Sequence, residues 1–204
     1  MSRPAARPRR ILLLFTKAPT PGRVMTRLAG SIGDAAAAVC QRRLIAAGVT
    51  HLARDPRWTT ILAVRPGRRV RGARRWAGPV RPVAQARGAL GPAMLTGLQR
   101  AGAEQVVLVG TDVPALRRRH IARAFALLGR ADLVFGPATD GGYWLIGARR
   151  AALTGLRLDT VRWSSRHALA DSLLCVPATR RVVLADELED LDDLAAYRRW
   201  RAGR

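Results

Sequence analysis

Cysteine and long apolar runs are both scarce in this chain of 204 residues. The two cysteines, Cys40 and Cys175, lie far apart and outside any Cys-x-x-Cys spacing, which argues against a disulfide framework or a zinc knuckle. The longest run of aliphatic and aromatic residues, from Ile11 to Phe15, has five residues. A membrane span needs about 20 such residues, and the apolar stretch of an export signal needs about 7–15. We therefore predict a cytoplasmic protein without a membrane span.

Lysine is almost absent, although the chain is strongly basic. Its 36 basic residues comprise 35 arginines and Lys17, and the formal net charge at pH 7 is +22. A GC-rich genome places arginine and alanine at unconstrained surface positions, so this charge is weak support for nucleic-acid binding. The ten aromatic residues and the lack of a known binding motif argue against specific nucleic-acid recognition. A non-specific nucleic-acid-binding protein, held by phosphate contacts that salt weakens, stays one alternative.

Acidic residues are scarce, with 14 in the whole chain against 36 basic residues. Only Asp34, Asp55 and Glu104 precede residue 112, and six others lie between residues 186 and 193. The isolated acids elsewhere, such as Asp112 and Asp140, are therefore candidates for a chemical role.

Apolar strands and amphipathic helices alternate along almost the whole chain. Residues 1–10 form a Pro/Arg-rich arm that we predict to be disordered, and residues 11–204 are predicted to form one α/β domain. The strands are continuous apolar runs, which is typical of a parallel sheet covered by helices on both faces. Asp34 is predicted to cap the first helix. The predicted strands span residues 11–16, 59–64, 79–83, 105–110, 132–136, 143–147 and 181–185, and the predicted helices span residues 34–54, 91–102, 117–129, 164–174 and 191–201.

The loop after the first strand, residues 17–30, has the composition of a phosphate-binding loop. Gly22 lets the backbone approach a ligand closely, and Lys17, Arg23 and Arg27 supply cations that suit a diphosphate. Ligands of open α/β sheets bind beyond the carboxyl ends of the strands, where this loop lies. Neither GxxxxGK[ST] nor GxGxxG is present. An ordinary loop with scattered arginines is the alternative interpretation.

Two further strands end in candidate chemical groups. Asp112 follows the strand 105–110 closely, and its carboxylate there suits Mg²⁺ or Mn²⁺ bound against a phosphate. An aspartate that caps a turn is the structural alternative. The strand 132–136 leads into Asp140-Gly141-Gly142, a sequence that by itself is typical of a tight turn. The same position would let Asp140 orient or deprotonate an acceptor hydroxyl.

Three segments carry a resemblance to a known family: FTKAPTPGRVMTRLA, VGTDVPAL and FGPATDGGYWLIG. From about residue 11 to residue 195, the chain resembles a bacterial family classed as glycosyltransferases, some of whose members are linked to arsenosugar biosynthesis. The resemblance implies a single-domain, Rossmann-like nucleotide-diphospho-sugar transferase fold of the GT-A type. It also implies kinship with molybdenum-cofactor and phospholactate guanylyltransferases.

The resemblance also implies roles for the candidate residues. In such folds the first loop holds the nucleotide phosphates, the acid after the central strand binds the metal, and the Asp-Gly-Gly turn lies beside the acceptor. The residues so assigned are Lys17, Gly22, Arg23, Arg27, Gly141 and Gly142 for the nucleotide, Asp112 for the metal, and Asp140 for catalysis.

The acidic segment near residue 190 offers a second metal ligand. Glu187 and Glu189 stand where the family has an Asp-Val-Asp pattern, and we predict Glu189 as the ligand. Helix capping is the alternative role of this segment, because Asp190 and Asp193 fit the cap and the third position of the last helix.

The function predicted from the sequence is a metal-dependent glycosyltransferase. It would use Mg²⁺ or Mn²⁺ and move a sugar from a nucleotide-diphosphate donor to a small-molecule acceptor. A nucleotidyltransferase on the same fold is one alternative. A catalytically silent relative is another, favoured by three departures from the family pattern: Met25 replaces a lysine, Ala89 an acid and Ala93 an arginine.

Overall fold

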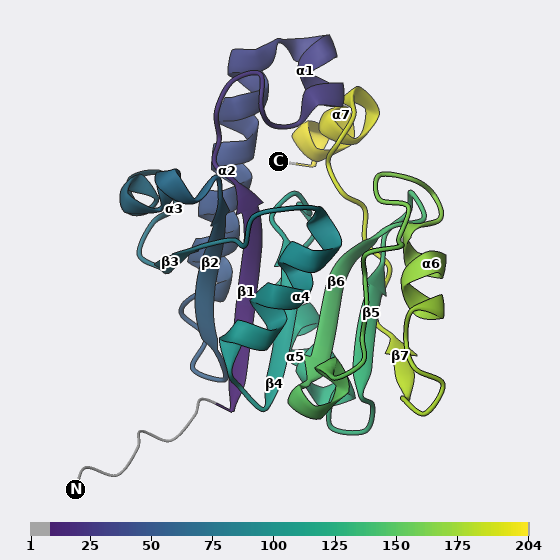
Figure 1. Cartoon of the computed structure of the whole chain (residues 1–204). Coiled ribbons are helices and arrows are strands. Elements are labelled where there is room, and N and C mark those ends of the chain that lie inside the picture. Colours follow the sequence, from purple (N-terminus) through teal and green to yellow (C-terminus); the bar gives the residue numbers. More distant parts are fainter. Residues whose placement is uncertain (1–8, 204) are drawn as a thin grey trace, which may run out of the picture.

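The computed structural model describes residues 9–203 of the chain (Figure 1). Of the arm predicted to be disordered, residues 1–8 lie outside the described residues, and Arg10 already belongs to the first strand. Within the described part of the chain, no helix combines the length and the apolarity needed to cross a bilayer.

Seven strands of the described chain form one sheet, which is parallel except around a single strand. In the sheet their order is β3-β2-β1-β4-β6-β5-β7, and β6 runs antiparallel to both neighbours. The first residues of β6 therefore lie at the edge where the parallel strands end. The strands are β1 (Arg10–Lys17), β2 (Thr59–Arg65), β3 (Arg81–Ala84), β4 (Gln105–Gly110), β5 (Leu133–Pro137), β6 (Tyr143–Arg149) and β7 (Val182–Leu184).

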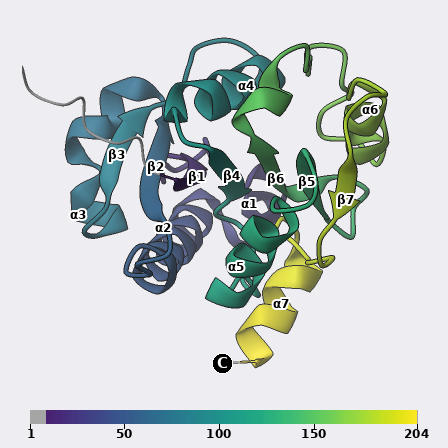
Figure 2. The ribbon, with the colours of Figure 1, turned by 90° about the horizontal axis from the view of Figure 1, so that it is seen from below.

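Helices cover both faces of the sheet, as Figure 2 shows from below. On one face lie α2 (Asp34–Leu52), α3 (Arg74–Ala77) and α5 (Arg118–Leu127), and on the other lie α4 (Leu90–Ala101) and α6 (Ala168–Leu174). Side chains alternate along β1, so Leu12 and Leu14 pack toward α2 and α5, whereas Leu13 packs toward α4. Burial on both faces explains the continuous apolar strands and confirms the predicted α/β domain.

A third, smaller apolar cluster lies beyond the sheet edge at which the parallel strands end. There α1 (Thr26–Ile32) and α7 (Leu194–Ala202) pack on each other and on α2, at the top of Figure 1. Leu28 of α1 and Leu191, just before α7, are fully buried in this cluster. Asp193 caps α7, because its Oδ1 accepts from the main-chain N of Ala196 at 2.8 Å.

The predicted strands are confirmed to within two residues, whereas several helices differ. α1 forms inside the segment predicted as a loop, because Leu28 gains tertiary packing that no local pattern reveals. Gly33, not Asp34, occupies the cap position of α2. α6 begins at Ala168 rather than at residue 164, and the last helix begins at Leu194. Short helical turns also occupy residues 67–72, 74–77 and 150–153.

Candidate functional site

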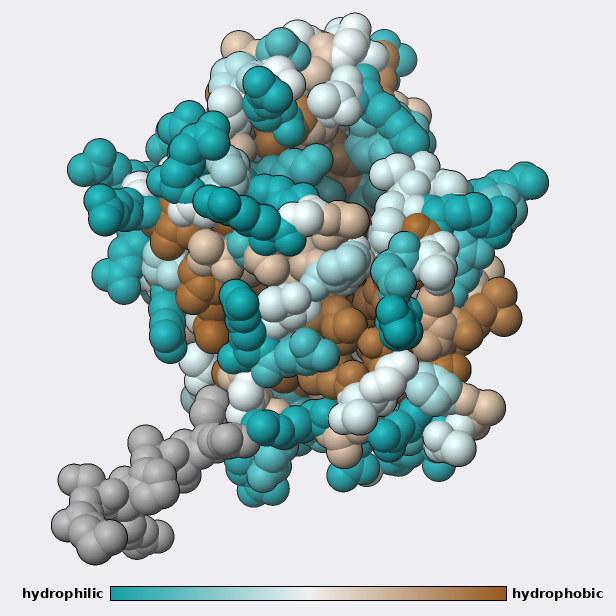
Figure 3. Space-filling view, in the orientation of Figure 1, coloured by the Kyte–Doolittle hydropathy of each residue, from teal (hydrophilic) through white to brown (hydrophobic). Residues whose placement is uncertain are grey.

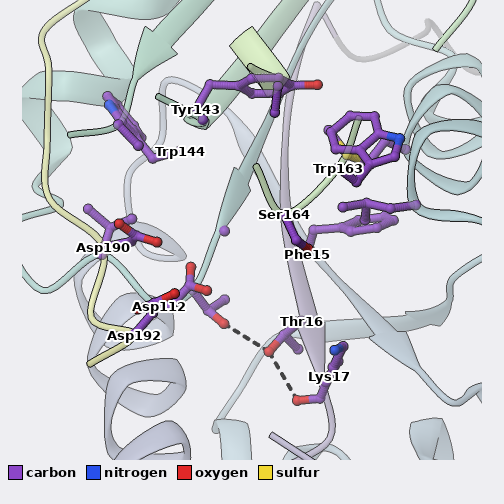
Figure 4. A pocket seen from close by; sticks show the side chains of 18 of the residues that line it. Phe15, Thr16, Lys17, Asp112, Tyr143, Trp144, Trp163, Ser164, Asp190 and Asp192 are labelled. Atoms are coloured by element: carbon purple, nitrogen blue, oxygen red, sulfur yellow. Dashed lines mark hydrogen bonds between the residues drawn. The ribbon is translucent and has the colours of Figure 1, made fainter. Parts of the chain in front are cut away.

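A pocket of about 350 Å³ opens at the edge where β1 and β4 end and β6 begins. Its lining falls into two parts (Figure 4). Asp112, Asp190 and Asp192 lie on one side of the view, and Phe15 and Trp163 lie on the other. The pocket therefore joins an acidic part and an aromatic part at the position where open α/β sheets bind ligands.

A buried polar network forms the floor of this pocket. Thr111 Oγ1 donates to Thr16 Oγ1 at 2.8 Å, and Gln41 Nε2 donates to these two hydroxyl oxygens at 3.4 and 3.3 Å. Because Thr16 belongs to β1, Thr111 follows β4 and Gln41 belongs to α2, the network ties three elements together. Sequence reasoning missed these residues, although a polar residue at the end of an apolar strand was the available signal.

Four of the 14 acidic residues line the pocket: Asp112, Asp140, Asp190 and Asp192. Asp112 is placed by the turn after β4, and the acidic segment joins it because Leu191 N donates to the main-chain oxygen of Asp112 at 2.7 Å. Acids from three separate segments are thus gathered at one edge of the sheet.

Burial raises the pKa of Asp112, and the nearby carboxylates of Asp192 and Asp140 raise it further, while Lys17 opposes them. Burial, followed by the charges of Asp140 and Asp112, raises the pKa of Asp190 to about 6. These carboxylates therefore disfavour one another's charge, and a cation placed among them would relieve the repulsion.

The residues of the acidic part fit a metal ion that arrives with a phosphate ligand. Within residues 9–203, no set of three His, Cys, Asp or Glu side chains converges as a group that could hold a metal. Mg²⁺ in nucleotide sites is commonly held by one or two carboxylates together with substrate phosphates and water. Asp112, together with Asp190 or Asp192, supplies the one or two carboxylates that such a site needs.

The acidic segment turns residues other than the predicted ligand Glu189 toward the pocket. Glu189 does not line the pocket and pairs with Arg199 of α7, whereas Asp190 and Asp192 do line it. Asp190 also plays no part in capping α7, which is the role of Asp193.

The loop after β1 contributes less to the pocket than its composition suggested. Lys17 lines the pocket, but Gly22, Arg23 and Arg27 do not. Arg27 instead forms an ion pair with Asp192, with 2.8 Å between Nη1 and Oδ2. Gly22 has a φ of 69°, so the turn itself calls for glycine there.

Met25, which replaces the family's lysine, lines the pocket from the start of α1. It has left-handed backbone angles, with φ 47° and ψ 47°, and packs partly against the cluster around Leu28. The position that the family pattern gives to a lysine therefore does face the pocket.

The Asp140-Gly141-Gly142 segment is a tight turn at the mouth of the pocket. Asp140 Oδ1 accepts from Gly142 N at 2.8 Å, and Gly141 N donates to Ala138 O at 3.1 Å. Asp140 and Gly142 line the pocket, whereas Gly141 packs against the main chain of Arg166. Asp140 thus stabilises the turn and also faces the site.

Gly110 is required for the position of the Asp112 carboxylate. A Cβ at residue 110 would lie 2.5 Å from Asp112 Oδ1, so Gly110→Ala is expected to displace that carboxylate while the fold survives. We expect a stability loss of about 1 kcal/mol and at least tenfold weaker metal-dependent binding of a nucleoside diphosphate, measured by calorimetric titration. Gly48→Ala is the control, because a Cβ at Gly48 meets nothing within 4 Å. Equal affinities for both variants would contradict this role of Gly110.

The sequence model of one family, described as "Uncharacterized protein conserved in bacteria (DUF2064)", matches residues 48–165. No curated protein matches the chain.

Solved structures share the fold. A Desulfovibrio desulfuricans G20 protein assigned as a nucleotide-diphospho-sugar transferase is 28% identical, with 91% of this chain and 83% of that chain covered and a TM-score of 0.78. A mannosyltransferase from Pyrobaculum calidifontis, in complex with GDP-Man and Mn²⁺, is 14% identical over 97% of this chain and 61% of that chain (TM-score 0.56). A Methanothermobacter nucleotidyl transferase is 16% identical, with 95% of this chain and 96% of that chain covered and a TM-score of 0.58. The predicted fold of nucleotide-diphospho-sugar transferases is confirmed.

Proposed function

The chain belongs to the bacterial protein family DUF2064, and we propose that it is a metal-dependent glycosyltransferase with a nucleotide-diphosphate sugar as donor. The solved structures that it resembles are glycosyl- and nucleotidyltransferases. The observation that carries the proposal is that Asp112, Asp190 and Asp192 line the same pocket as Lys17 at the edge of the sheet. This arrangement supports the binding of a divalent cation together with a diphosphate.

The acidic part of the pocket is assigned to the leaving group of the donor. Asp112, with Asp190 or Asp192, would hold a Mg²⁺ or Mn²⁺ ion. When bound, the ion would neutralise charge that develops on the diphosphate as it leaves. Lys17 would add a compact positive charge to the same phosphates.

The proposed reaction exchanges one bond at the anomeric carbon of the donor sugar. An acceptor hydroxyl oxygen forms the new bond to this carbon, while the bond from the carbon to the β-phosphate oxygen breaks. The electron pair of the broken bond leaves with the nucleoside diphosphate. The hydroxyl proton passes to the carboxylate of Asp140, which the turn holds in place through the bond from Gly142 N.

Gln85 marks the side of the pocket that we assign to the nucleoside. Its Nε2 donates to the main-chain oxygens of Thr16 and Ala63 at 2.8 and 2.9 Å, so both amide hydrogens are used. The Oε1 atom is left as an acceptor, which suits the amino group of a nucleobase. The acceptor substrate would then approach from the Asp140 side.

Nucleotidyl transfer is the second candidate function, favoured by the shared fold of the Methanothermobacter nucleotidyl transferase. In that reaction an acceptor oxygen would attack the α-phosphorus of a nucleoside triphosphate, and pyrophosphate would leave. Product analysis with Mg²⁺ or Mn²⁺ separates the two functions. Nucleoside diphosphate released from a nucleotide sugar supports sugar transfer, whereas pyrophosphate released from a nucleoside triphosphate supports nucleotidyl transfer.

Met25→Lys is expected to tighten the binding of a nucleoside diphosphate by at least about tenfold. The added ammonium would face a pocket that Arg23 and Arg27 do not line, and a charge-assisted hydrogen bond contributes about 1.5–3 kcal/mol. Titration calorimetry with UDP and GDP in the presence of Mg²⁺ measures the change.

The matched control for this substitution is Val39→Lys, which adds the same charge at an exposed position of α2 outside the pocket. An unchanged affinity of Met25→Lys would mean that the existing cations already neutralise the phosphates. A tenfold gain combined with a parent chain inactive on every donor would favour the catalytically silent relative.

A further inference from the structure

The segment between β6 and α6 forms one wall of the aromatic part of the pocket, and it is firmly held. The Arg162 side chain donates to both carboxylate oxygens of Asp171, at 2.8 and 2.9 Å, and Arg162 N donates to the same group at 3.0 Å. Gly141 packs so closely on the main chain of Arg166 that no Cβ would fit between them. The positions of the side chains on this wall are therefore set before any ligand binds.

Trp163 presents an aromatic ring whose polar atom has no hydrogen-bond partner within residues 9–203. Its indole packs against Tyr143, with 5.9 Å between ring centroids and 64° between planes. The buried Nε1 atom makes no hydrogen bond to the described residues. A buried donor without an acceptor costs free energy that phenylalanine would avoid at the same place. The indole N–H thus has no structural use in the protein without its ligand.

Ser164, the next residue, has a strained backbone and exposes its side chain at the pocket. Its φ is 58°, a value that non-glycine residues rarely adopt. Strain of this kind persists where the surroundings impose it, and it gathers at functional sites. The neighbouring Ser165 Oγ donates to Arg162 O and accepts from His167 N, so that hydroxyl is already used. Ser164 is the serine of this wall whose hydroxyl is held toward a ligand.

The side chains that we assign to the aromatic part of the pocket carry no formal charge. The residues that the wall contributes to the lining are Trp163, Ser164, Ser165 and Ala168. Phe15, Tyr143 and Met94 complete this part. Arg162 is neutralised by Asp171, and the acids across the pocket would repel an anion. Figure 4 shows Trp163 and Ser164 apart from Asp190 and Asp192, where the diphosphate is assigned.

We infer that this part of the pocket is the acceptor subsite and that it takes a neutral, hydroxyl-bearing ring, a sugar or a cyclitol. The C–H face of such a ring packs on flat aromatic surfaces, and its hydroxyls are the partners that the Ser164 hydroxyl and the Trp163 N–H lack. The inference rests on the proposed glycosyl transfer, in which one ring hydroxyl attacks the anomeric carbon and gives its proton to Asp140.

A binding experiment tests the subsite without any donor chemistry. Saturation-transfer NMR is recorded with methyl α-mannopyranoside, methyl β-glucopyranoside and myo-inositol, and with glycerol 3-phosphate as the anionic probe. The neutral probes are expected to receive saturation from the parent chain and to lose at least three quarters of it in Trp163→Ala. Glycerol 3-phosphate is expected to receive none. Failure of all three neutral probes to bind would overturn the inference.

A kinetic experiment separates an acceptor role from a structural one. Release of nucleoside diphosphate from a nucleotide sugar is followed with each probe as acceptor. Trp163→Phe, which keeps an aromatic ring of smaller size but lacks the N–H, is expected to raise the acceptor KM at least fivefold and to leave the donor KM unchanged. Ser164→Ala should act in the same direction. Trp76→Phe, on α3 and outside the pocket, is the control.

The outcomes distinguish a failure of the acceptor subsite from a failure of the proposed glycosyl transfer. If the neutral probes bind at Trp163 but no nucleotide sugar is consumed, the subsite stands as a binding site and the proposed glycosyl transfer fails. If nucleotide sugar is consumed, and Trp163→Phe and Ser164→Ala keep the acceptor KM of the parent chain, the acceptor subsite is refuted. Acceleration by glycerol 3-phosphate alone would refute the neutral class of acceptor.

Discussion

Asp112→Asn should lower the transferase rate at least about a hundredfold, which is equivalent to about 2.7 kcal/mol of transition-state stabilisation. Asparagine keeps the shape of the side chain but removes the charge that we assign to the metal ion. The main-chain oxygen of Asp112 still accepts from Leu191 N, so the acidic segment stays in place. Metal-dependent nucleotide binding, measured by titration with and without Mn²⁺, should fall together with the rate.

The stability of the same variant should stay equal or increase. Burial and neighbouring carboxylates raise the pKa of Asp112, which means that the fold disfavours its charged form. Near neutral pH, replacement by a neutral amide removes this cost, so the free energy of unfolding should not fall. Urea unfolding at pH 7 measures it. Rate lost without stability lost is the signature of a functional residue.

Asp159→Asn is the control for Asp112→Asn, because Asp159 is paired with Arg157 at 3.5 Å and lies outside the pocket. It should change neither nucleotide binding nor rate. An Asp112→Asn variant that binds the metal and nucleotide as well as the parent chain does would remove the metal assignment. A variant that unfolds would assign Asp112 a structural role instead.

Gly141→Ala is expected to cost about 2–5 kcal/mol of stability, the largest effect of any single methyl group proposed for this chain. Gly141 has a φ of +84°, and a left-handed conformation costs a side chain about 1–2 kcal/mol. The new Cβ would also lie 2.3 Å from Arg166 O and 2.8 Å from the carbonyl carbon. Main-chain atoms cannot swing aside, and overpacking costs about 1–3 kcal/mol.

The turn and the wall of the aromatic part should both shift in this variant. Gly141 O accepts from Leu169 N at 3.1 Å, so displacement of the turn also pulls on α6. We expect the acceptor KM to rise while nucleotide binding changes little. Gly33→Ala is a matched control, because Gly33 has the same φ of +84° but nothing within 4 Å of the added Cβ. Equal stability losses in urea for the two variants would exclude the close packing on Arg166.

The sequence predicted the elements of the sheet well, because continuous apolar runs such as residues 105–110 can bury both faces only inside an α/β domain. It did not predict that β6 lies antiparallel between β4 and β5, since strand order depends on contacts between distant segments. α1 was missed for the same reason. Its seven residues form a helix because Leu28 packs in the cluster with α7.

The sequence pointed to the edge of the sheet at which the pocket opens, but not to every residue that lines it. Lys17, Asp112 and Asp140 line the pocket, as expected of side chains that follow parallel strands. In the acidic segment, Glu189 and Asp190 are adjacent in the sequence, and only the path of the backbone decides which of them faces the pocket. The sequence also did not reveal that Arg27 of the first loop forms an ion pair with Asp192 and does not line the pocket.

The dependence of the pocket on Asp190 and Asp192 has a consequence for protein synthesis. A nascent chain that stops short of residue 190 contains the segments of all seven strands but lacks two of the four carboxylates that line the pocket. Translation adds about 5–20 residues per second, and domains generally fold as units. The pocket therefore matures only when the segment that carries α7 has left the ribosome. Until then, an unfinished polypeptide lacks two of the carboxylates to which we assign the metal ion.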